Sequence, residues 1–338
     1  MVYAILLAPA SNRVYAGEAP GLVAAELSVL LEAAGRDPGP IEPLDLAGVG
    51  YLSLDVAPDD VTERELGRAS AVLATYEKVG DLLRPVVAPR PDHFDDDLVT
   101  IPKYPGKTNE QFTRLLVNVT LAAQGRSRPG PASVLDPMSG RGTTLSTAWT
   151  LGHHAYGVEA DPKAVDAQAT FLRTYLRRKR IKHRVTSTPV RRDGRHLGRR
   201  LDAEVLPPDG SPELELSVFT GDTRDSANLF GKKRFDAIVT DAPYGIVHGS
   251  ATRDPRTGKR GRQRSAAELL AEAIPVWAPQ LKPGGSLGLS WNTYGLRREQ
   301  LAEIARGAGL EPLIDGPWLR FGHRVDSSIH RDVFVARA

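Results

Sequence analysis

The segment SVLDPMSGRGTTL, residues 133–145, decides the fold class of this chain. A short apolar run ends in Asp136, and a loop of Ser, Gly and Thr that contains Gly140 and Gly142 follows it. This order is typical of a strand, a tight loop and the first turn of a helix in an open α/β sheet. Ligands of such sheets lie beyond the carboxyl ends of the strands, so we expect this loop to form the floor of a ligand site.

Two phosphate-binding loops match this segment poorly. A dinucleotide loop needs G-x-G-x-x-G, but Leu145 stands where the third glycine would be. A P-loop needs Gly-Lys followed by Ser or Thr, and GRGTT has no lysine. The loop therefore favours a different ligand, one that glycines at positions 140 and 142 would allow to approach closely.

Acidic residues follow the same pattern at the next three predicted strands. Glu159 ends the second strand, Asp222 follows the third and Asp241 follows the fourth. Glu159 is placed to accept both hydroxyls of a ribose, and Asp222 to accept an adenine amino group. An acidic rim of this kind suits S-adenosylmethionine, a cationic ligand with an adenosine and an amino-acid tail. We expect this cofactor to contact Asp136, Ser139, Gly140, Gly142, Thr143, Glu159, Ala160, Asp222, Thr223 and Asp241.

The order of elements predicts the fold class. Strands and helices alternate through the second part of the chain, which indicates a mostly parallel sheet with helices on both faces. The last two strands, within 310–321 and 327–336, predict an antiparallel hairpin. Residues 186–213 fit no element and are expected to form an insertion. The other predicted strands are 133–136, 155–159, 216–219, 235–240 and 285–291, and the predicted helices are 143–151, 162–180, 224–229, 265–279 and 296–307.

A smaller unit precedes this alternation. Proline and an acidic run predict a linker near 87–100, and Thr108 with Gln111 has the spacing of a capping box at the next helix. We expect an N-terminal α/β domain with a ferredoxin-like fold over 1–95 and a second domain over 100–338. The N-terminal prediction rests on strands at 2–8 and 51–56 and on helices at 20–34 and 61–74.

Composition and charge narrow the functional class. The chain has 338 residues and no cysteine, which excludes disulfides, thiolate metal sites and a cysteine nucleophile. We expect no membrane segment and a cytoplasmic protein. Residues 1–100 carry seven Lys and Arg against seventeen Asp and Glu, whereas 173–200 carry twelve against Asp193 alone. With a second basic segment at 253–264, this clustering predicts RNA binding, and solvated surface charge is the alternative.

Several motifs resemble one enzyme family. DPMSGRGTTL at 136–145 and DAPYG at 241–245 resemble the cofactor loop and the D/N/S-P-P-Y/F motif of amino methyltransferases that act on nucleic-acid bases. KYPGKTNEQF at 103–112, FDAIVTDAPYGIVHGSATRD at 235–254 and RVDSSIHRDVFVA at 324–336 resemble archaeal and eukaryotic tRNA guanine-N2 methyltransferases. The resemblance implies a Rossmann-like class I methyltransferase fold for the second domain, with S-adenosylmethionine as cofactor and tRNA or another RNA as partner.

The resemblance also implies roles for residues. Asp241 would accept a hydrogen bond from the target amine, a main-chain carbonyl at Ala242 or Pro243 would accept another, and Tyr244 would stack on the base. Lys107 and Thr108 would face the cofactor carboxylate at a helix start. The alternatives are a turn-forming role for Asp241 and a surface position beside a helix cap for Lys107. We expect no metal site.

The chain departs from the family in two ways. Ala242 replaces the first proline of the motif, and about twenty residues stand where relatives carry an RNA-binding THUMP module. Docking of RNA would then use the two basic segments or a protein partner subunit. The leading hypothesis is methyl transfer to guanine N2 in RNA. The alternatives are a small-molecule or peptide N-methyltransferase, a DNA adenine-N6 or cytosine-N4 methyltransferase, and a non-catalytic RNA-binding protein.

Overall fold

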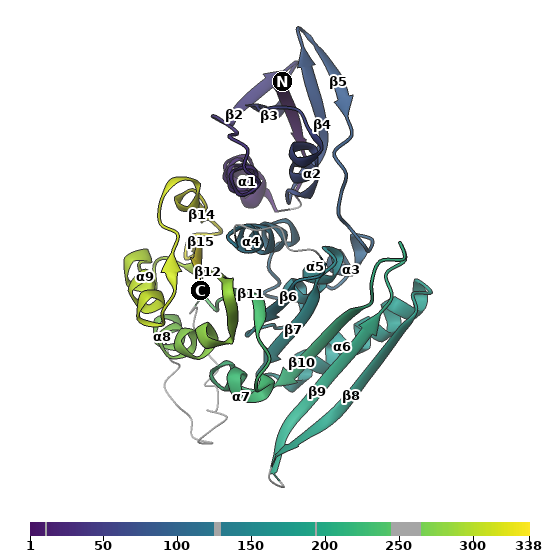
Figure 1. The fold of residues 1–338 in the computed structure, drawn as a ribbon, viewed down its shortest axis with the longest axis vertical. Coiled ribbons are helices and arrows are strands. Elements are labelled where there is room, and N and C mark those ends of the chain that lie inside the picture. The colour runs from purple at the N-terminus through teal and green to yellow at the C-terminus, as the bar shows by residue number, and fades with distance from the viewer. Residues whose placement is uncertain (11, 125–129, 193–194, 245–264) are drawn as a thin grey trace.

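The chain forms two sheets that pack against each other through helices (Figure 1). The computed structural model describes residues 1–10, 12–124, 130–192, 195–244 and 265–338. A five-stranded antiparallel sheet belongs to the N-terminal part, and a ten-stranded sheet with a parallel centre belongs to the remainder. The predicted fold class is confirmed: an α/β chain with a mostly parallel sheet that ends in antiparallel strands, preceded by a smaller α/β unit.

The N-terminal sheet has the strand order β2-β3-β1-β4-β5, with every neighbouring pair antiparallel. Its first six elements along the chain follow the βαββαβ order of ferredoxin-like folds, and β5 is added at one edge. The strands are β1 (Val2–Leu7), β2 (Glu42–Leu46), β3 (Val49–Asp55), β4 (Val72–Val79) and β5 (Leu82–Val86), and the helices are α1 (Arg13–Ala33) and α2 (Asp60–Arg68).

The helix predicted at 61–74 ends earlier than expected, at Arg68. The backbone N–H of Ser70 donates to the carboxylate of Glu26 on α1, at 3.0 Å from Oε2, and the Ser70 hydroxyl donates to the same oxygen at 2.6 Å. This buried carboxylate takes the Ser70 N–H, which would otherwise continue the helix. The residues after it form β4 instead.

Helix α1 is apolar and long enough to cross a membrane by length and composition, with a mean hydropathy of 1.3 over its best window. Within the protein, 61% of that window is buried. Leu22, Leu27 and Leu30 pack into the main core cluster, which includes Phe112 and Leu116 of α4. Its apolar surface is therefore used in packing between the two sheets.

The larger sheet runs in the order β13-β15-β12-β11-β6-β7-β10-β9-β8, and β14 pairs with β15. From β10 to β12 its five central strands are parallel neighbours in the Rossmann order 3-2-1-4-5. The strand order reverses between β6 and β11, which is where ligands bind in such sheets. The central strands are β6 (Ser133–Asp136), β7 (His154–Glu159), β10 (Leu214–Thr220), β11 (Phe235–Asp241) and β12 (Leu281–Asn292).

Antiparallel strands close one side of this sheet, as predicted. β15 (His330–Arg337) pairs with β12, and β13 (Glu311–Pro312) and β14 (His323–Arg324) pair with β15. The strand expected within 310–321 is only two residues long, because Pro312 lacks a backbone donor and a short 3-10 helix, η3 (Gly316–Leu319), follows.

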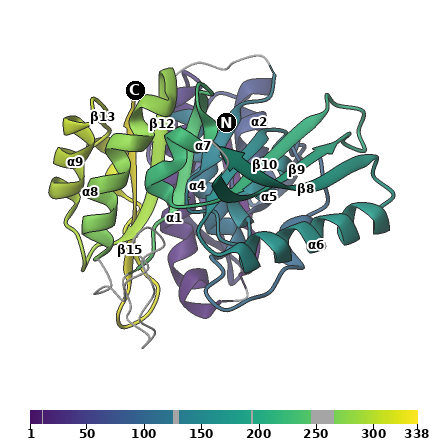
Figure 2. The same cartoon turned by 90° about the horizontal axis from the view of Figure 1, so that it is seen from below.

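The prediction that 186–213 forms no element was wrong. These residues lie mostly in β8 (His183–Arg192) and β9 (Arg195–Val205), a long hairpin that extends the sheet beyond β10 and lies beside α6 (Figures 1 and 2). Leu201, Ala203 and Val205 alternate with charged residues and bury one face. The many arginines of the segment concealed this period-2 pattern.

Helices cover both faces of the larger sheet (Figure 2). α8 and α9 pack against each other, and α4 lies between this sheet and α1. The predicted limits at 95 and 100 remain a prediction, since a single core cluster runs through both parts. The helices are α3 (Asp97–Thr100), α4 (Glu110–Ala122), α5 (Thr143–Thr150), α6 (Pro162–Arg178), α7 (Ser226–Phe230), α8 (Ala266–Trp277) and α9 (Arg298–Gly307), with 3-10 helices η1 (Thr223–Asp225) and η2 (Ala278–Gln280).

Candidate active site

The ends of β6 and β11 bring two of the predicted acids to the same edge of the sheet. Ile238 of β11 lies opposite Leu135 of β6 in the parallel register. The Thr240 hydroxyl donates to Asp136 Oδ1 at 2.8 Å, and the backbone N–H of Met138 donates to the same oxygen at 3.0 Å. Because Thr240 precedes Asp241, the two carboxylates lie at the topological switch point of the sheet.

Asp136 is an acid held in an unfavourable environment. Its side chain is buried, and this loss of hydration raises the pKa of the carboxyl from 3.8 to about 6, with a further contribution from the nearby charge of Asp241. The hydrogen bonds from Thr240 and Met138 oppose the rise but do not cancel it. A buried carboxyl with a raised pKa at a switch point is typical of a functional site.

The glycine loop follows β6 along the chain and is hydrogen-bonded to the end of β7. Gly140 has φ 53° and Gly142 has φ 83°, in the left-handed region that favours glycine. The N–H of Gly140 donates to Glu159 Oε2 at 2.8 Å, which ties the loop to the second strand end. A Cβ at Gly142 would lie 2.0 Å from Gln168 Nε2. Ser139 is buried, with its N–H on the Val158 carbonyl at 3.0 Å, and Thr143 begins α5.

The third strand ends beside the second. The N–H of Gly221 donates to the Glu159 carbonyl at 2.9 Å, and Asp161 N–H donates to Glu159 Oε1 at 2.7 Å. Ala160 is exposed. The structure therefore places Asp136, Glu159 and the start of the 221–223 turn along one edge of the sheet, in the order that the sequence predicts.

Asp222 has a partner that the sequence analysis did not identify. Its carboxylate accepts from Arg224 Nε at 2.8 Å, and Arg224 also donates to Glu272 at 2.8 Å. Thr223 is buried, and Trp277 Nε1 donates to its hydroxyl at 3.1 Å. In this arrangement Asp222 holds a guanidinium, and Thr223 faces the α8 side rather than open solvent.

Asp241 is surrounded by hydroxyl donors. Thr108 donates to Oδ2, and Ser290 and Tyr244 both donate to Oδ1. A carboxylate offers about four lone-pair positions, so three are already used. Ser290 lies opposite Asp241 in the β11–β12 register. The sequence alone does not give this register, so Ser290 was not predicted as a partner of Asp241.

The start of α4 differs from the prediction. The N-cap is Asn109, whose side chain accepts from Phe112 N–H at 3.0 Å, so the predicted capping box of Thr108 with Gln111 is wrong. Thr108 instead uses its hydroxyl on Asp241. The Lys107 ammonium donates to the Val99 carbonyl at 2.6 Å and pairs with Glu110. Both partners lie within eight residues of Lys107 in the chain, Val99 in α3 and Glu110 in the first turn of α4.

Ala242 stands where the motif that this segment resembles has its first proline, and the structure shows what alanine does there. Its N–H donates to the Ser290 carbonyl at 2.9 Å, which continues the β11–β12 pairing past Asp241. Proline at this position would remove that donor. Ala242 is buried and Pro243 is exposed, so the motif leaves the sheet at Pro243.

Tyr244 packs on a buried arginine. The Arg331 guanidinium lies 5.1 Å from the centre of the Tyr244 ring and 4.4 Å from that of Phe112. Burial, together with the charge of Asp241, raises the pKa of Tyr244 well above its ordinary value. A second aromatic near the glycine loop is Tyr104, whose hydroxyl lies 2.7 Å from Thr143 Oγ1. Neither Arg331 nor Tyr104 was predicted as a site residue.

The basic segment 173–200 is only partly paired with acids. Lys179 pairs with Asp95 and Asp97, at 2.7 and 2.6 Å, and Arg184 pairs with Glu204 at 2.6 Å. Exposed basic side chains with no ion pair among the described residues are Arg173, Arg177, Arg178, Arg180, Lys182 and Arg199. The second basic segment, 253–264, lies outside the described residues.

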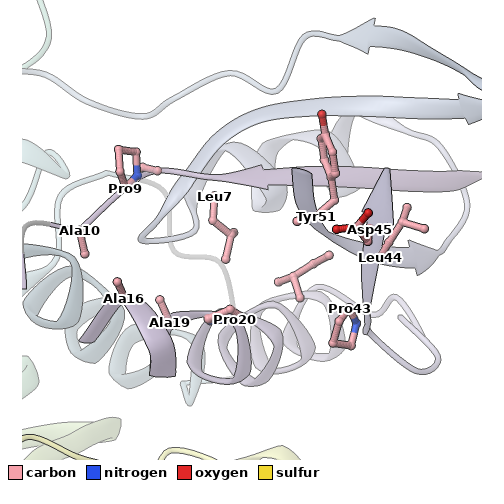
Figure 3. A pocket seen from close by; sticks show the side chains of 13 residues that line it. Leu7, Pro9, Ala10, Ala16, Ala19, Pro20, Pro43, Leu44, Asp45 and Tyr51 are labelled. Atoms are coloured by element: carbon pink, nitrogen blue, oxygen red, sulfur yellow. The ribbon is translucent and has the colours of Figure 1, made fainter. Parts of the chain in front are cut away.

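A metal site or a cavity elsewhere among the described residues would be an alternative to this site. Among the described residues, no group of three His, Asp or Glu side chains is placed to hold a metal ion. A cavity of about 420 Å³ lies between α1 and β1 to β3, with Leu7, Pro20 and Leu44 in its walls (Figure 3). A second, of about 570 Å³, lies beside α2 and the end of α4. Neither Asp136 nor Asp241 lines either cavity.

Several solved methyltransferase structures are similar to this chain at low sequence identity. No family model matches the chain, and no curated protein matches it. TrmN from Thermus thermophilus is similar at 17% identity, over 86% of this chain and 57% of that one, with a TM-score of 0.41. The 16S rRNA N2-guanine methyltransferase RsmC of the same species, solved with AdoMet and guanosine, is similar at 17%, over 89% and 58%, with a TM-score of 0.38.

A TehB-like SAM-dependent methyltransferase from Corynebacterium glutamicum is similar at 16% identity, over 62% of this chain and 81% of that one, with a TM-score of 0.34. The chain spans less than three fifths of the TrmN and RsmC chains. At identities of 16–17% and TM-scores of 0.34–0.41, these similarities assign no role to any residue of this chain.

Proposed function

We propose that the chain is an S-adenosylmethionine-dependent N-methyltransferase that acts on an exocyclic amine of a nucleobase, with guanine N2 in RNA as the leading substrate. One observation carries this proposal: the glycine loop, Glu159 and Asp241 share one edge of the sheet. Glu159 accepts from the Gly140 N–H, and the hydroxyl of Thr240, the residue before Asp241, donates to Asp136. Cofactor-binding and catalytic groups would then face the same ligand space.

The residues present fit the cofactor. Asp136 and Glu159 are carboxylates at adjacent strand ends, which suits a cationic ligand with a ribose. Both polar side-chain atoms of Gln168 are buried without a hydrogen-bond partner, and they lie beside Gly142, where a Cβ would collide with them. A buried amide without partners beside a glycine turn is consistent with a ligand contact at this point. When bound, the cofactor supplies an electrophilic methyl group.

The chain's own groups would hold the acceptor amine. Asp241 can accept one N–H of the amine at the Oδ1 position that the Tyr244 hydroxyl occupies in this structure, and a carbonyl at Ala242 or Pro243 can accept another. These contacts orient the nitrogen lone pair and stabilise the positive charge that develops on it. Thr108 and Ser290 fix the Asp241 carboxylate, so the acceptor is preorganised. The chemistry needs positioning rather than a strong base.

RNA as the substrate is supported by the charges on α6. Arg173 and Arg177 are exposed four residues apart on one face of α6, and the exposed Arg180 lies just after the end of the helix. Like charges at this spacing destabilise a helix by about 0.2–0.5 kcal/mol for each pair. A row of this kind without acidic partners among the described residues is suited to a phosphate backbone.

The experiment is a methyl-transfer assay with labelled S-adenosylmethionine and separate fractions of total RNA, DNA and small molecules. We expect label in RNA. Asp241→Asn should retain cofactor affinity within about threefold and lose more than 100-fold in turnover, on the scale of a lost electrostatic contact. Asp166→Asn, the same charge change at an exposed site on α6, is the matched control. Label in small molecules or DNA would replace the RNA proposal, and normal turnover of Asp241→Asn would refute the catalytic role.

The RNA-binding surface has its own test. We expect Arg173→Ser, Arg177→Ser and Arg180→Ser together to weaken RNA binding and to lower the slope of log affinity against log salt by about 2, since each phosphate contact contributes about 0.7 for single strands. Arg306→Ser, exposed on α9, is the control. An unchanged slope would exclude these three arginines as the contact.

A further inference from the structure

Arg331 is a buried cation whose interactions are unusual for arginine. Only 6% of its surface is exposed, and its Nε is buried without a hydrogen-bond partner. No carboxylate among the described residues forms an ion pair with it. A buried guanidinium is costly unless other contacts offset the lost hydration. Its strongest visible contacts are the two aromatic rings of Phe112 and Tyr244.

Each ring of this sandwich belongs to an element of the candidate active site. Phe112 lies in the first turn of α4, where Thr108 precedes the helix and donates to Asp241. Tyr244 follows the β11 strand end and donates its hydroxyl to Asp241. Arg331, at the start of β15, therefore links both sides of the Asp241 carboxylate. A planar guanidinium can stack on two faces at once, which a lysine ammonium does less well.

The Tyr244 hydroxyl occupies an acceptor position that the proposed function assigns to the substrate. Thr108, Ser290 and Tyr244 use three of about four lone-pair positions of Asp241. An amine that donates to Asp241 at this position, or a base that stacks on the Tyr244 ring, requires the tyrosine hydroxyl to leave Asp241. The tyrosine thus has two alternative partners, the carboxylate and the base.

We propose that Arg331 is a positioning residue for Tyr244: it holds the tyrosine ring so that its hydroxyl lies on Asp241, and it guides the ring onto the target base when the amine displaces that hydroxyl. The role assigned to the base rests on the proposed function. The role assigned to the Arg331–Tyr244 contact does not, because it concerns the arrangement of the chain itself.

The first test is a double-mutant cycle on unfolding by urea, with Arg331→Leu, Tyr244→Leu and both changes. We expect the two changes to be coupled by about thirtyfold in the unfolding equilibrium constant, the size of a desolvated cation–aromatic contact. Arg298→Leu is the matched control, because Arg298 stacks on Trp291 at 5.3 Å and pairs with Asp332 instead. It should be additive with Tyr244→Leu. Additivity of Arg331→Leu as well would overturn the contact.

The second test observes the tyrosine directly. With 3-fluorotyrosine incorporated at position 244 of the full chain, we expect one fluorine resonance that moves in Arg331→Leu and in Asp241→Asn but not in Arg298→Leu. Arg331→Lys keeps the charge and guards against misfolding, and it should give an intermediate shift. A resonance that does not move in Arg331→Leu would refute the positioning role, whether or not the protein transfers methyl groups.

The third test uses methyl transfer by the intact chain. We expect Arg331→Leu to lower kcat/KM by about tenfold in the wild-type background and by less than twofold in the Tyr244→Leu background, because its effect passes through Tyr244. Equal losses in both backgrounds would overturn the proposal. Absence of methyl transfer by the wild-type protein would refute the proposed function instead, and the first two tests would still decide the role of Arg331.

Discussion

Replacing Asp136 by Asn should change how the stability of the protein depends on pH. Burial raises the pKa of this carboxyl from 3.8 to about 6. Between these values the folded state binds a proton that the unfolded state has lost, so the wild-type protein loses stability as pH rises from about 4 to 6. The rise in pKa corresponds to about 3 kcal/mol, at about 1.4 kcal/mol for each tenfold change.

The amide introduced by Asp136→Asn would keep an oxygen for Thr240 and Met138 without carrying a charge. We therefore expect the difference in the free energy of unfolding between Asp136→Asn and the wild type to shift by about 3 kcal/mol in favour of Asp136→Asn as pH rises from about 4 to about 7.5. The assay is urea unfolding at a series of pH values. Asp166→Asn, at an exposed site, is the control. If the difference in the free energy of unfolding between Asp136→Asn and the wild type stays constant over this range, burial does not raise the pKa of Asp136 and the prediction is wrong.

The same carboxyl connects pH to the proposed cofactor. A cationic ligand beside Asp136 favours its ionised form, so binding should tighten as pH rises through about 6. We expect the Kd of S-adenosylmethionine, measured by calorimetry, to rise by up to tenfold for each pH unit below 6 in the wild type. In Asp136→Asn this dependence should be lost. Equal pH profiles would place the ligand away from Asp136.

Three further changes test the packing around the site by urea unfolding. Gly288→Ala should lower the free energy of unfolding by about 1–3 kcal/mol, because the added Cβ would lie 1.7 Å from Thr120 Oγ1 of α4. The control Gly295→Ala should change it by less than about 0.5 kcal/mol, because the nearest atom to its Cβ, the Asn292 carbonyl oxygen, is 3.7 Å away. Ala242→Pro should cost about 1–3 kcal/mol because it removes the donor to the Ser290 carbonyl, and Ala242→Gly, which keeps the N–H, should cost less than 1 kcal/mol. Glu26→Leu should cost about 3 kcal/mol because Ser70 and Asn118 lose their acceptor, and Glu26→Gln should recover most of this loss. Equal costs within any of these pairs would contradict the contact concerned.

The alternating core of the fold could be predicted from the sequence because its strands are short apolar runs that end in acids. SVLD and FDAIVTD are buried along nearly their whole length, and such runs have few alternative structures. The acids at their ends then fall on one edge by topology alone. This is why the relation between Asp136, Glu159 and the glycine loop was predictable without coordinates.

Contacts that depend on distant parts of the chain could not be predicted. Thr108 and Asn109 are both good helix caps, and the choice between them depends on Asp241, which lies 133 residues further on. Ser290 reaches Asp241 through the register of β11 and β12, and Arg331 is placed beside Tyr244 by the pairing of β15 with β12. The hairpin β8–β9 was missed for a different reason, since charged side chains on its outer face obscured the alternation beneath.

That hairpin has a consequence for how the protein behaves at high concentration. Without β9, the strand β10 would offer an open row of backbone donors and acceptors flanked by Leu214, Leu216 and Val218, which is a template for aggregation. The edge that the hairpin presents instead, β8, carries Arg184 and Pro189, and both discourage another chain from adding a strand. The hairpin thus protects the sheet from self-association.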